Sequence, residues 1–97
     1  MNLHLLKVFV RVVDENSFSR AAEALGISQP AASKSVRELE SQLDTVLLER
    51  RGRFFEPTEA GAVLLKYGHS LFALEREADE AVRTFNGLNR GHLRIGA

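Results

Sequence analysis

The stretch that decides the fold is SFSRAAEALGISQPAASK, residues 17–34. Ser17 is a good N-cap for a short helix, and Gly26 is the usual residue where a helix ends in a left-handed turn. Ser28 then caps a second helix. Ala22 is small enough to let the two helices cross closely. The spacing therefore predicts a helix-turn-helix over residues 18–37.

The second of these helices has two distinct faces. Its apolar residues step by four, three and four and should face the core: Ala32, Val36, Leu39 and Leu43. Its opposite face carries the polar residues Gln29, Ser33, Lys34 and Arg37. Gln can pair with adenine and Arg with guanine, while Ser and Lys reach phosphates. These residues predict double-stranded DNA as the partner, although Lys34 and Arg37 could also be surface ion-pair residues, Arg37 with Glu40.

Two further elements complete the expected DNA-binding domain, residues 1–58. A first helix, capped by Asn2 and ended by residues 14–16, should pack on the core through Leu3, Leu6, Val10 and Val13. Residues 46–57 break the helical period, and the apolar stretches 46–48 and 54–55 flank Glu49, Arg50, Arg51, Gly52 and Arg53. This pattern predicts a two-stranded wing, and its basic turn is a second candidate DNA contact.

A long helix is predicted after the Thr58 cap. Apolar residues recur every seven positions in two series that are offset by three residues, and the second series ends at Leu88. This is the a/d pattern of a coiled coil, sustained for four repeats. A helix over residues 59–86 is roughly 40 Å long, more than a small domain covers alone. A homodimer is expected, through Leu64, Tyr67, Leu71, Leu74, Ala78, Ala81 and Phe85.

Composition excludes several classes of protein. The 97 residues contain no cysteine, no apolar run that crosses a bilayer and no secretory signal, so a cytoplasmic, non-membrane protein is expected. No nucleophile–base pair, metal cluster or phosphate loop is present, which argues against an enzyme and against a metal or cofactor in this chain. Thirteen basic residues balance thirteen acidic ones. That neutrality supports one alternative, a winged-helix dimerisation or protein-interaction module that does not read DNA.

The chain resembles the N-terminal part of the LysR-type transcriptional regulators. The resemblance rests on residues 17–34, on Leu39-Glu40, on PTEAG at residues 57–61 and on GHLRIG at residues 91–96. It implies a mainly α fold: a winged helix-turn-helix of three helices and a two-stranded wing, then a linker helix over residues 59–88 that pairs antiparallel in a dimer. It also implies that residues 89–97 are a hinge and the start of a missing effector-binding domain. That domain would bind a small-molecule co-inducer, and the full-length protein would form tetramers.

The resemblance also implies roles for individual residues. Major-groove contacts are expected from Gln29, Pro30, Ser33 and Lys34, on an interrupted palindrome. Arg53 would approach the minor groove, and phosphates would be reached by Arg20, Arg50 and Thr58. Ser28, Arg37 and Arg51 complete the expected DNA-binding set, although Ser28 is first of all a cap. Asp44 and Leu48 depart from the family's usual glycine and phenylalanine, both on the way into the wing.

Overall fold

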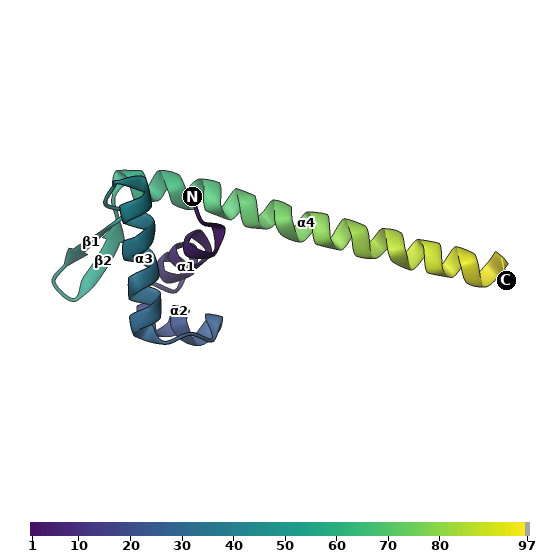
Figure 1. Cartoon of the computed structure of the whole chain (residues 1–97), viewed down its shortest axis with the longest axis horizontal. Coiled ribbons are helices and arrows are strands. Elements are labelled where there is room, and N and C mark those ends of the chain that lie inside the picture. The colour runs from purple at the N-terminus through teal and green to yellow at the C-terminus, as the bar shows by residue number, and fades with distance from the viewer. Residues whose placement is uncertain (97) are drawn as a thin grey trace.

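The computed structural model describes the backbone of residues 1–96 and the side chains of residues 1–87. Three helices, a hairpin and a long helix follow one another along the chain (Figure 1): α1 (Leu3–Glu15), α2 (Phe18–Leu25), α3 (Gln29–Leu43), β1 (Leu48–Arg51), β2 (Phe54–Pro57) and α4 (Glu59–Gly96). The molecule measures 65 × 24 × 19 Å, with α4 leading away from the other elements. The predicted mainly α winged helix-turn-helix with a long last helix is confirmed.

The helix ends follow the predicted caps. The Asn2 carboxamide oxygen accepts from the backbone N–H of His4 at 2.8 Å, and the hydroxyls of Ser17 and Ser28 cap α2 and α3 in the same way. Gly26 ends α2 with a φ of 70°. Asp44 ends α3 with a φ of 49°, a left-handed conformation in which a non-glycine side chain is strained.

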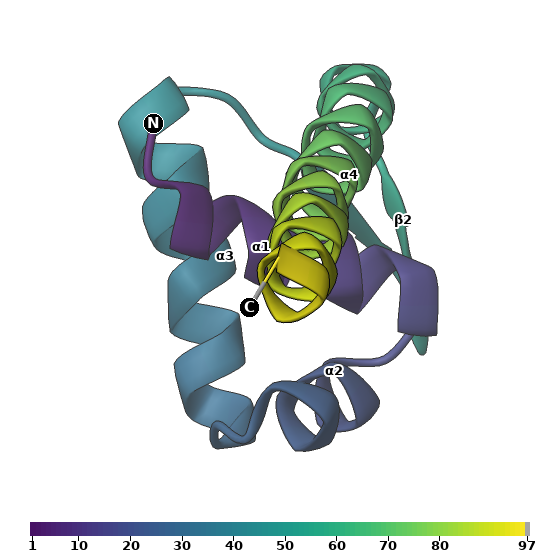
Figure 2. The same ribbon diagram turned by 90° about the vertical axis from the view of Figure 1, so that its right-hand side faces the viewer.

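The core lies around α1, which is buried on two sides. Figure 2 shows α1 between α4 on one side and α2 and α3 on the other, and α1 contacts all three helices. Phe9 and Val12 are fully buried toward the centre of the domain, and Val10 and Leu6 meet Gly68 of α4. The predicted single face was therefore incomplete. Leu3, expected in the core, is 53% exposed, whereas Leu5 and Leu6 in the same turn of α1 are buried.

The recognition helix α3 buries three of its four predicted core residues, namely Ala32, Val36 and Leu39. Leu43 is the exception, with 37% of its surface exposed. It is the last residue of α3, where the chain turns away through Asp44 toward the wing. The buried side of α3 packs on both α1 and α2.

The wing is a β-hairpin whose two strands are joined by a two-residue turn. It begins at Leu48 and is therefore shorter than the predicted residues 46–57. Its antiparallel register pairs Arg51 with Phe54 and Arg50 with Phe55, and Gly52 takes a φ of 62° in the turn. Val46 and Leu47 precede the first strand. Leu47 is buried, because it fills the space between α3 and the start of α4.

The last helix is longer than the sequence predicted. The sequence predicts a hinge near residue 88 followed by the first residues of a strand, whereas α4 continues to Gly96 in this structure. A glycine in a helix costs about 1 kcal/mol and does not by itself end it. A strand needs a neighbouring strand, and the described residues offer this segment none. Within the described part of the chain, no helix is both long enough and apolar enough for a bilayer.

Candidate nucleic-acid interface

The recognition helix presents its polar face to solvent. Gln29, Lys34 and Arg37 are exposed, as is Pro30 in the first turn, whereas Ser33 is half-buried. The carboxamide oxygen of Gln29 accepts a hydrogen bond from the Ser19 hydroxyl at 3.3 Å. A carboxamide oxygen has two lone pairs, so this bond orients Gln29 and still leaves an acceptor and both N–H donors for a base edge.

Two predicted hydroxyl contacts already have structural roles. Ser28 accepts the Ala31 N–H at 3.2 Å, which leaves its hydroxyl proton available. Thr58 donates its only hydroxyl proton to the carbonyl of Val46 at 2.7 Å and accepts the N–H of Gly61 at 3.0 Å. A phosphate can only accept, so a phosphate contact by Thr58 would first have to break its bond to Val46.

The three wing arginines face different surroundings. Successive strand residues point to opposite faces, so Arg50 and Arg51 diverge. Arg51 lies on the outer face, with its Nε 2.7 Å from a carboxylate oxygen of Glu56 and a terminal nitrogen 3.7 Å from Glu49. These two glutamates lie opposite each other in the hairpin, where like charges repel, and Arg51 offsets that repulsion.

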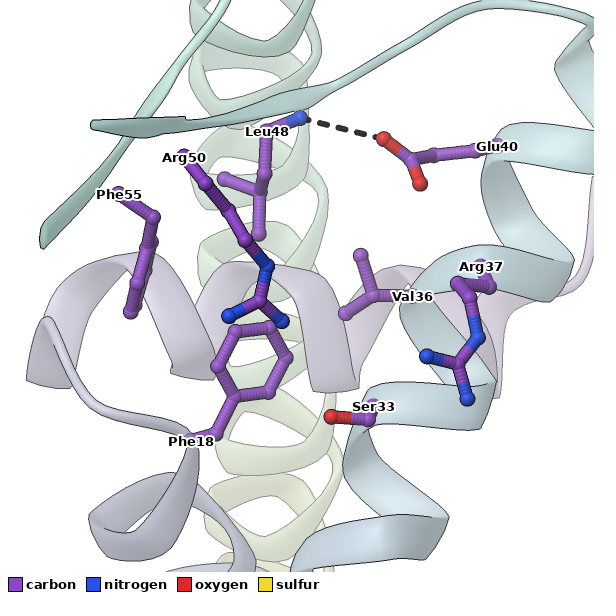
Figure 3. Close-up of a pocket in the computed structure, with 8 residues that line it drawn as sticks. All are labelled: Phe18, Ser33, Val36, Arg37, Glu40, Leu48, Arg50 and Phe55. Carbon is purple, nitrogen blue, oxygen red and sulfur yellow. Dashed lines mark hydrogen bonds between the residues drawn. The ribbon is translucent and has the colours of Figure 1, made fainter. Parts of the chain in front are cut away.

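Arg50 points instead toward Phe18 of α2 (Figure 3). Its guanidinium carbon lies 5.8 Å from the centre of the Phe18 ring, and that ring lies 5.1 Å from the ring of Phe55 at an angle of 56°. A cation over an aromatic face is attracted by the ring quadrupole. The two rings, one from α2 and one from β2, therefore hold Arg50 beside α3 (Figure 3).

The space between the hairpin and α3 forms a groove of about 220 Å³. We call it the wing groove; its lining residues are Phe18, Ser33, Val36, Arg37, Glu40, Leu48, Arg50 and Phe55. Its floor is apolar, and the guanidinium groups of Arg37 and Arg50 both lie along it (Figure 3). The groove brings together one predicted contact from the recognition helix, one from the wing and the half-buried Ser33.

Local pairing explains how a chain of zero net charge presents a basic site. Around the interface, Glu38 lies 3.9 Å from Lys34, Glu49 and Glu56 hold Arg51, and Glu40 binds backbone N–H groups. Among the side chains of residues 1–87, no acidic oxygen lies within 4.0 Å of the charged nitrogens of Arg20, Arg37, Arg50 or Arg53. Four exposed guanidinium groups are therefore available to a polyanion.

Three residues of this site were missing from the predicted set. Phe18 and Phe55 orient Arg50, and Glu40 was considered only as an ion-pair partner of Arg37. The strand period could have separated Phe55, which is half-buried, from Phe54, which is 72% exposed. Nothing local indicates that Phe18 meets Phe55, since 37 residues separate them.

A polar recognition helix beside a basic wing defines the class of winged helix-turn-helix DNA-binding domains. Residues 3–62 match the family model of the bacterial regulatory helix-turn-helix proteins of the lysR family. Because this match covers more than half of the chain, the protein belongs to the LysR family, which consists of transcriptional regulators and not enzymes. This confirms the resemblance that its motifs indicated.

Relatives with assigned names align along nearly the whole chain. A probable RuBisCO transcriptional regulator of Trichormus variabilis is 42% identical over 95 residues, 98% of this chain and 28% of its own length. The nitrogen assimilation regulatory protein nac of Klebsiella aerogenes is 42% identical over 96 residues, 99% of this chain and 32% of its own length. The chain thus spans about a third of the length of these relatives.

Solved structures of the family share the fold. The protein chain of the BenM_DBD/catB site 1 DNA complex superposes with a TM-score of 0.80 at 35% identity, covering 86% of this chain and 92% of that one. Full-length CbnR complexed with its target DNA gives 0.74 at 32% identity, covering 86% of this chain and 29% of that one. The chain is therefore a LysR-type DNA-binding domain by both sequence and structure.

Proposed function

We propose that this chain is the sequence-reading and dimer-forming part of a LysR-type transcriptional regulator. The observation that carries the proposal is the wing groove, which Arg37 of α3 and Arg50 of the wing both line, with no acidic partner among the described side chains. The DNA complexes solved for BenM_DBD and CbnR support it. As a regulator of genes it would act in the bacterial cytoplasm.

In this proposal the N-terminal half of α3 enters the major groove. Gln29, Pro30 and Ser33 contact base edges there, while Lys34 and Arg37 reach a base or the adjacent phosphates. Arg53, at the tip of the hairpin, approaches the minor groove. The remaining backbone contacts are assigned to Arg20, Ser28 and Arg50. Arg51 and Thr58 contribute less, because Glu56 and Val46 already bind them.

The second part of the proposal is a homodimer through α4. Its exposed apolar stripe includes Tyr67, Leu71, Leu74 and Phe85, at 66%, 37%, 62% and 63% exposure, with Ala78 and Ala81 exposed between them. Leu64 is half-buried and already packs on the core. Met1 and Leu3, at 64% and 53% exposure, extend the stripe onto the start of α1. A run of exposed apolar side chains along one face of a helix is typical of an interface.

Two copies joined in this way would read two half-sites of an interrupted palindrome on one face of the duplex, one helical turn or a multiple apart. In the full-length protein we expect an effector-binding domain for a small-molecule co-inducer and assembly into tetramers. The first expectation is supported by the full-length LysG of Corynebacterium glutamicum, which was solved with bound effector Arg.

The test is a fluorescence-anisotropy titration against duplexes from the region flanking the chain's own gene, with scrambled duplexes as controls, over a series of salt concentrations. Gln29→Ala should weaken binding to the specific duplex by roughly tenfold or more and relax preference at one base pair, since a bidentate pair contributes about 1–3 kcal/mol. Gln42→Ala, the same change at the other end of α3, is the matched control. Arg53→Ala should reduce the slope of log affinity against log salt concentration by about one. Arg83→Ala, on α4, should leave that slope unchanged.

Equal losses on specific and scrambled duplexes for Gln29→Ala would remove the base-reading role. Weak, equal binding of the unmodified chain to every duplex would favour the protein-interaction module instead, the reading that the zero net charge supports.

A further inference from the structure

The base of the wing is held to the recognition helix by one carboxylate. Glu40, on the C-terminal half of α3, accepts hydrogen bonds at one oxygen from the backbone N–H groups of Leu47 and Leu48, at 2.7 and 3.2 Å. Leu47 is 1% exposed, so its N–H has no access to water and needs a partner inside the protein. Figure 3 shows the bond to Leu48, at the upper edge of the wing groove.

The same segment is held from its other side by the start of α4. The carbonyl of Leu47 accepts the N–H of Thr58 at 2.9 Å, and the Thr58 hydroxyl donates to the carbonyl of Val46. Among the described residues the two strands pair with each other and with no further strand. The direction in which the hairpin leaves the domain therefore depends on these attachments at its base, together with the packing of Phe55 on Phe18.

We propose that Glu40 is a positioning residue for DNA recognition: it sets the angle between the wing and α3, and through it the span from Gln29 in the major groove to Arg53 in the minor groove. The inference rests on the proposed function. It also assigns Glu40 a role other than an ion pair with Arg37, for which the described side chains show no contact within 4.0 Å.

A carboxylate suits this role better than a neutral acceptor. Hydrogen bonds to an ionised acceptor are shorter and about twice as strong as neutral ones. One oxygen that binds two successive N–H groups also fixes the direction of the chain between them. An aspartate at the same position keeps the charge but is one methylene shorter, so its oxygen cannot reach Leu47 without a movement of the backbone.

The experiment compares Glu40→Asp with Glu38→Asp in the complete chain. Both changes keep the charge and shorten a glutamate on α3, but Glu38 only faces Lys34 at 3.9 Å. Affinity for the specific duplex should fall by roughly tenfold for Glu40→Asp and stay unchanged for Glu38→Asp. Glu40→Gln keeps the side-chain length but offers a weaker acceptor, so its affinity should lie between those of the other two variants. It replaces Glu40→Asp in the comparison if the aspartate variant does not fold.

Double-mutant cycles identify the part of the interface that is affected. In an Arg50→Ala/Arg53→Ala background both proposed wing contacts are already lost, so Glu40→Asp should cost little more. In a Gln29→Ala background, Glu40→Asp should still lower the affinity by the same factor as in the unmodified chain. An equal loss in both backgrounds, or a Glu40→Asp variant that binds like Glu38→Asp, would overturn the positioning role.

A measurement without DNA separates this inference from the proposed function. Residual dipolar couplings of the free protein should report a changed angle between the hairpin and α3 in Glu40→Asp and none in Glu38→Asp. Amide exchange at Leu47 and Leu48 should also quicken in the first variant alone. If the angle is unchanged, Glu40 does not position the wing, whatever the binding data show. If the angle changes while Arg53→Ala and Gln29→Ala bind DNA normally, Glu40 still orients the wing and it is the proposed DNA contacts that fail.

Discussion

A methyl group added at Gly61 should destabilise the domain strongly, because there is no room for it. Gly61 lies in the first turn of α4, and a Cβ there would overlap the carbonyl oxygen of Leu47 and lie 3.0 Å from its carbonyl carbon. That carbonyl belongs to the backbone and also accepts the N–H of Thr58 at 2.9 Å. Gly61→Ala must therefore push apart the base of the wing and the start of α4.

The expected loss follows from three contributions. Overpacking a well-packed site costs about 1–3 kcal/mol. Displacing the Leu47 carbonyl removes a hydrogen bond that contributes about 1 kcal/mol. The higher helix propensity of alanine offsets less than about 1 kcal/mol, since Gly61 lies at the helix start. The free energy of unfolding should thus fall by roughly 2–3 kcal/mol, and the melting temperature by about 10 °C or more.

Two other glycines of α4 provide matched controls. A Cβ at Gly68 would lie 2.6 Å from a methyl group of Val10, a side chain that can shift, so Gly68→Ala should cost less than Gly61→Ala. A Cβ at Gly87 meets nothing within 4 Å. Gly87→Ala should therefore stabilise the protein by about 0.5–1 kcal/mol, the usual gain at an open helical site.

The assay is urea unfolding followed by far-ultraviolet circular dichroism. Protein concentration must be held constant, because unfolding of a dimer depends on it. The predicted order of stability is Gly87→Ala, then the unmodified chain, then Gly68→Ala, then Gly61→Ala. A Gly61→Ala variant as stable as the unmodified chain would refute the close approach of Leu47 to α4.

Two further predictions concern the cap of α3 and the dimer. Asp44→Gly should stabilise the domain by roughly 0.5–1 kcal/mol in thermal unfolding, because glycine adopts the left-handed φ of 49° without strain and removes a negative charge from a helix C-terminus. Asp44→Asn should give only the part of this stabilisation that comes from removing the charge. A glycine variant less stable than the unmodified chain would contradict this reasoning. Leu74→Glu should convert the proposed dimer to monomers in sedimentation equilibrium, since it places a charge within the exposed stripe. Arg76→Glu places the same residue on the other side of α4 and should leave the dimer intact; dimers of equal strength in both variants would rule out the stripe as the interface.

Where each helix begins and where the first three end was predictable from local sequence. Asn2, Ser17 and Ser28 cap helices through bonds to residues two or three positions ahead, and such bonds form in any chain with that spacing. Gly26 likewise ends α2 through its own left-handed backbone. The recognition helix and its exposed polar face followed from periodicity alone, because one turn of helix determines which residues share a side.

The end of α4 was not predictable in the same way. Gly87 and the alternating residues after it are compatible with a hinge and strand as well as with a weak helix. The choice between them depends on whether a neighbouring strand is present to satisfy the backbone. The sequence of this segment contains no information about such a neighbour.

Which basic side chains of the site are paired and which are free could be seen only in the tertiary structure. Arg50 and Arg51 are adjacent and chemically identical, yet the register of the hairpin turns one toward Phe18 and the other toward Glu56. Glu40 has the sequence spacing of an ion-pair partner for Arg37, but the path of the chain into the wing brings two N–H groups to it first. The sequence by itself therefore determined the helices, their caps and the chemical character of the interface. Only the closure of the wing onto α3 decided which charged side chains remain available to DNA, because that choice depends on contacts between elements that meet only in the folded chain.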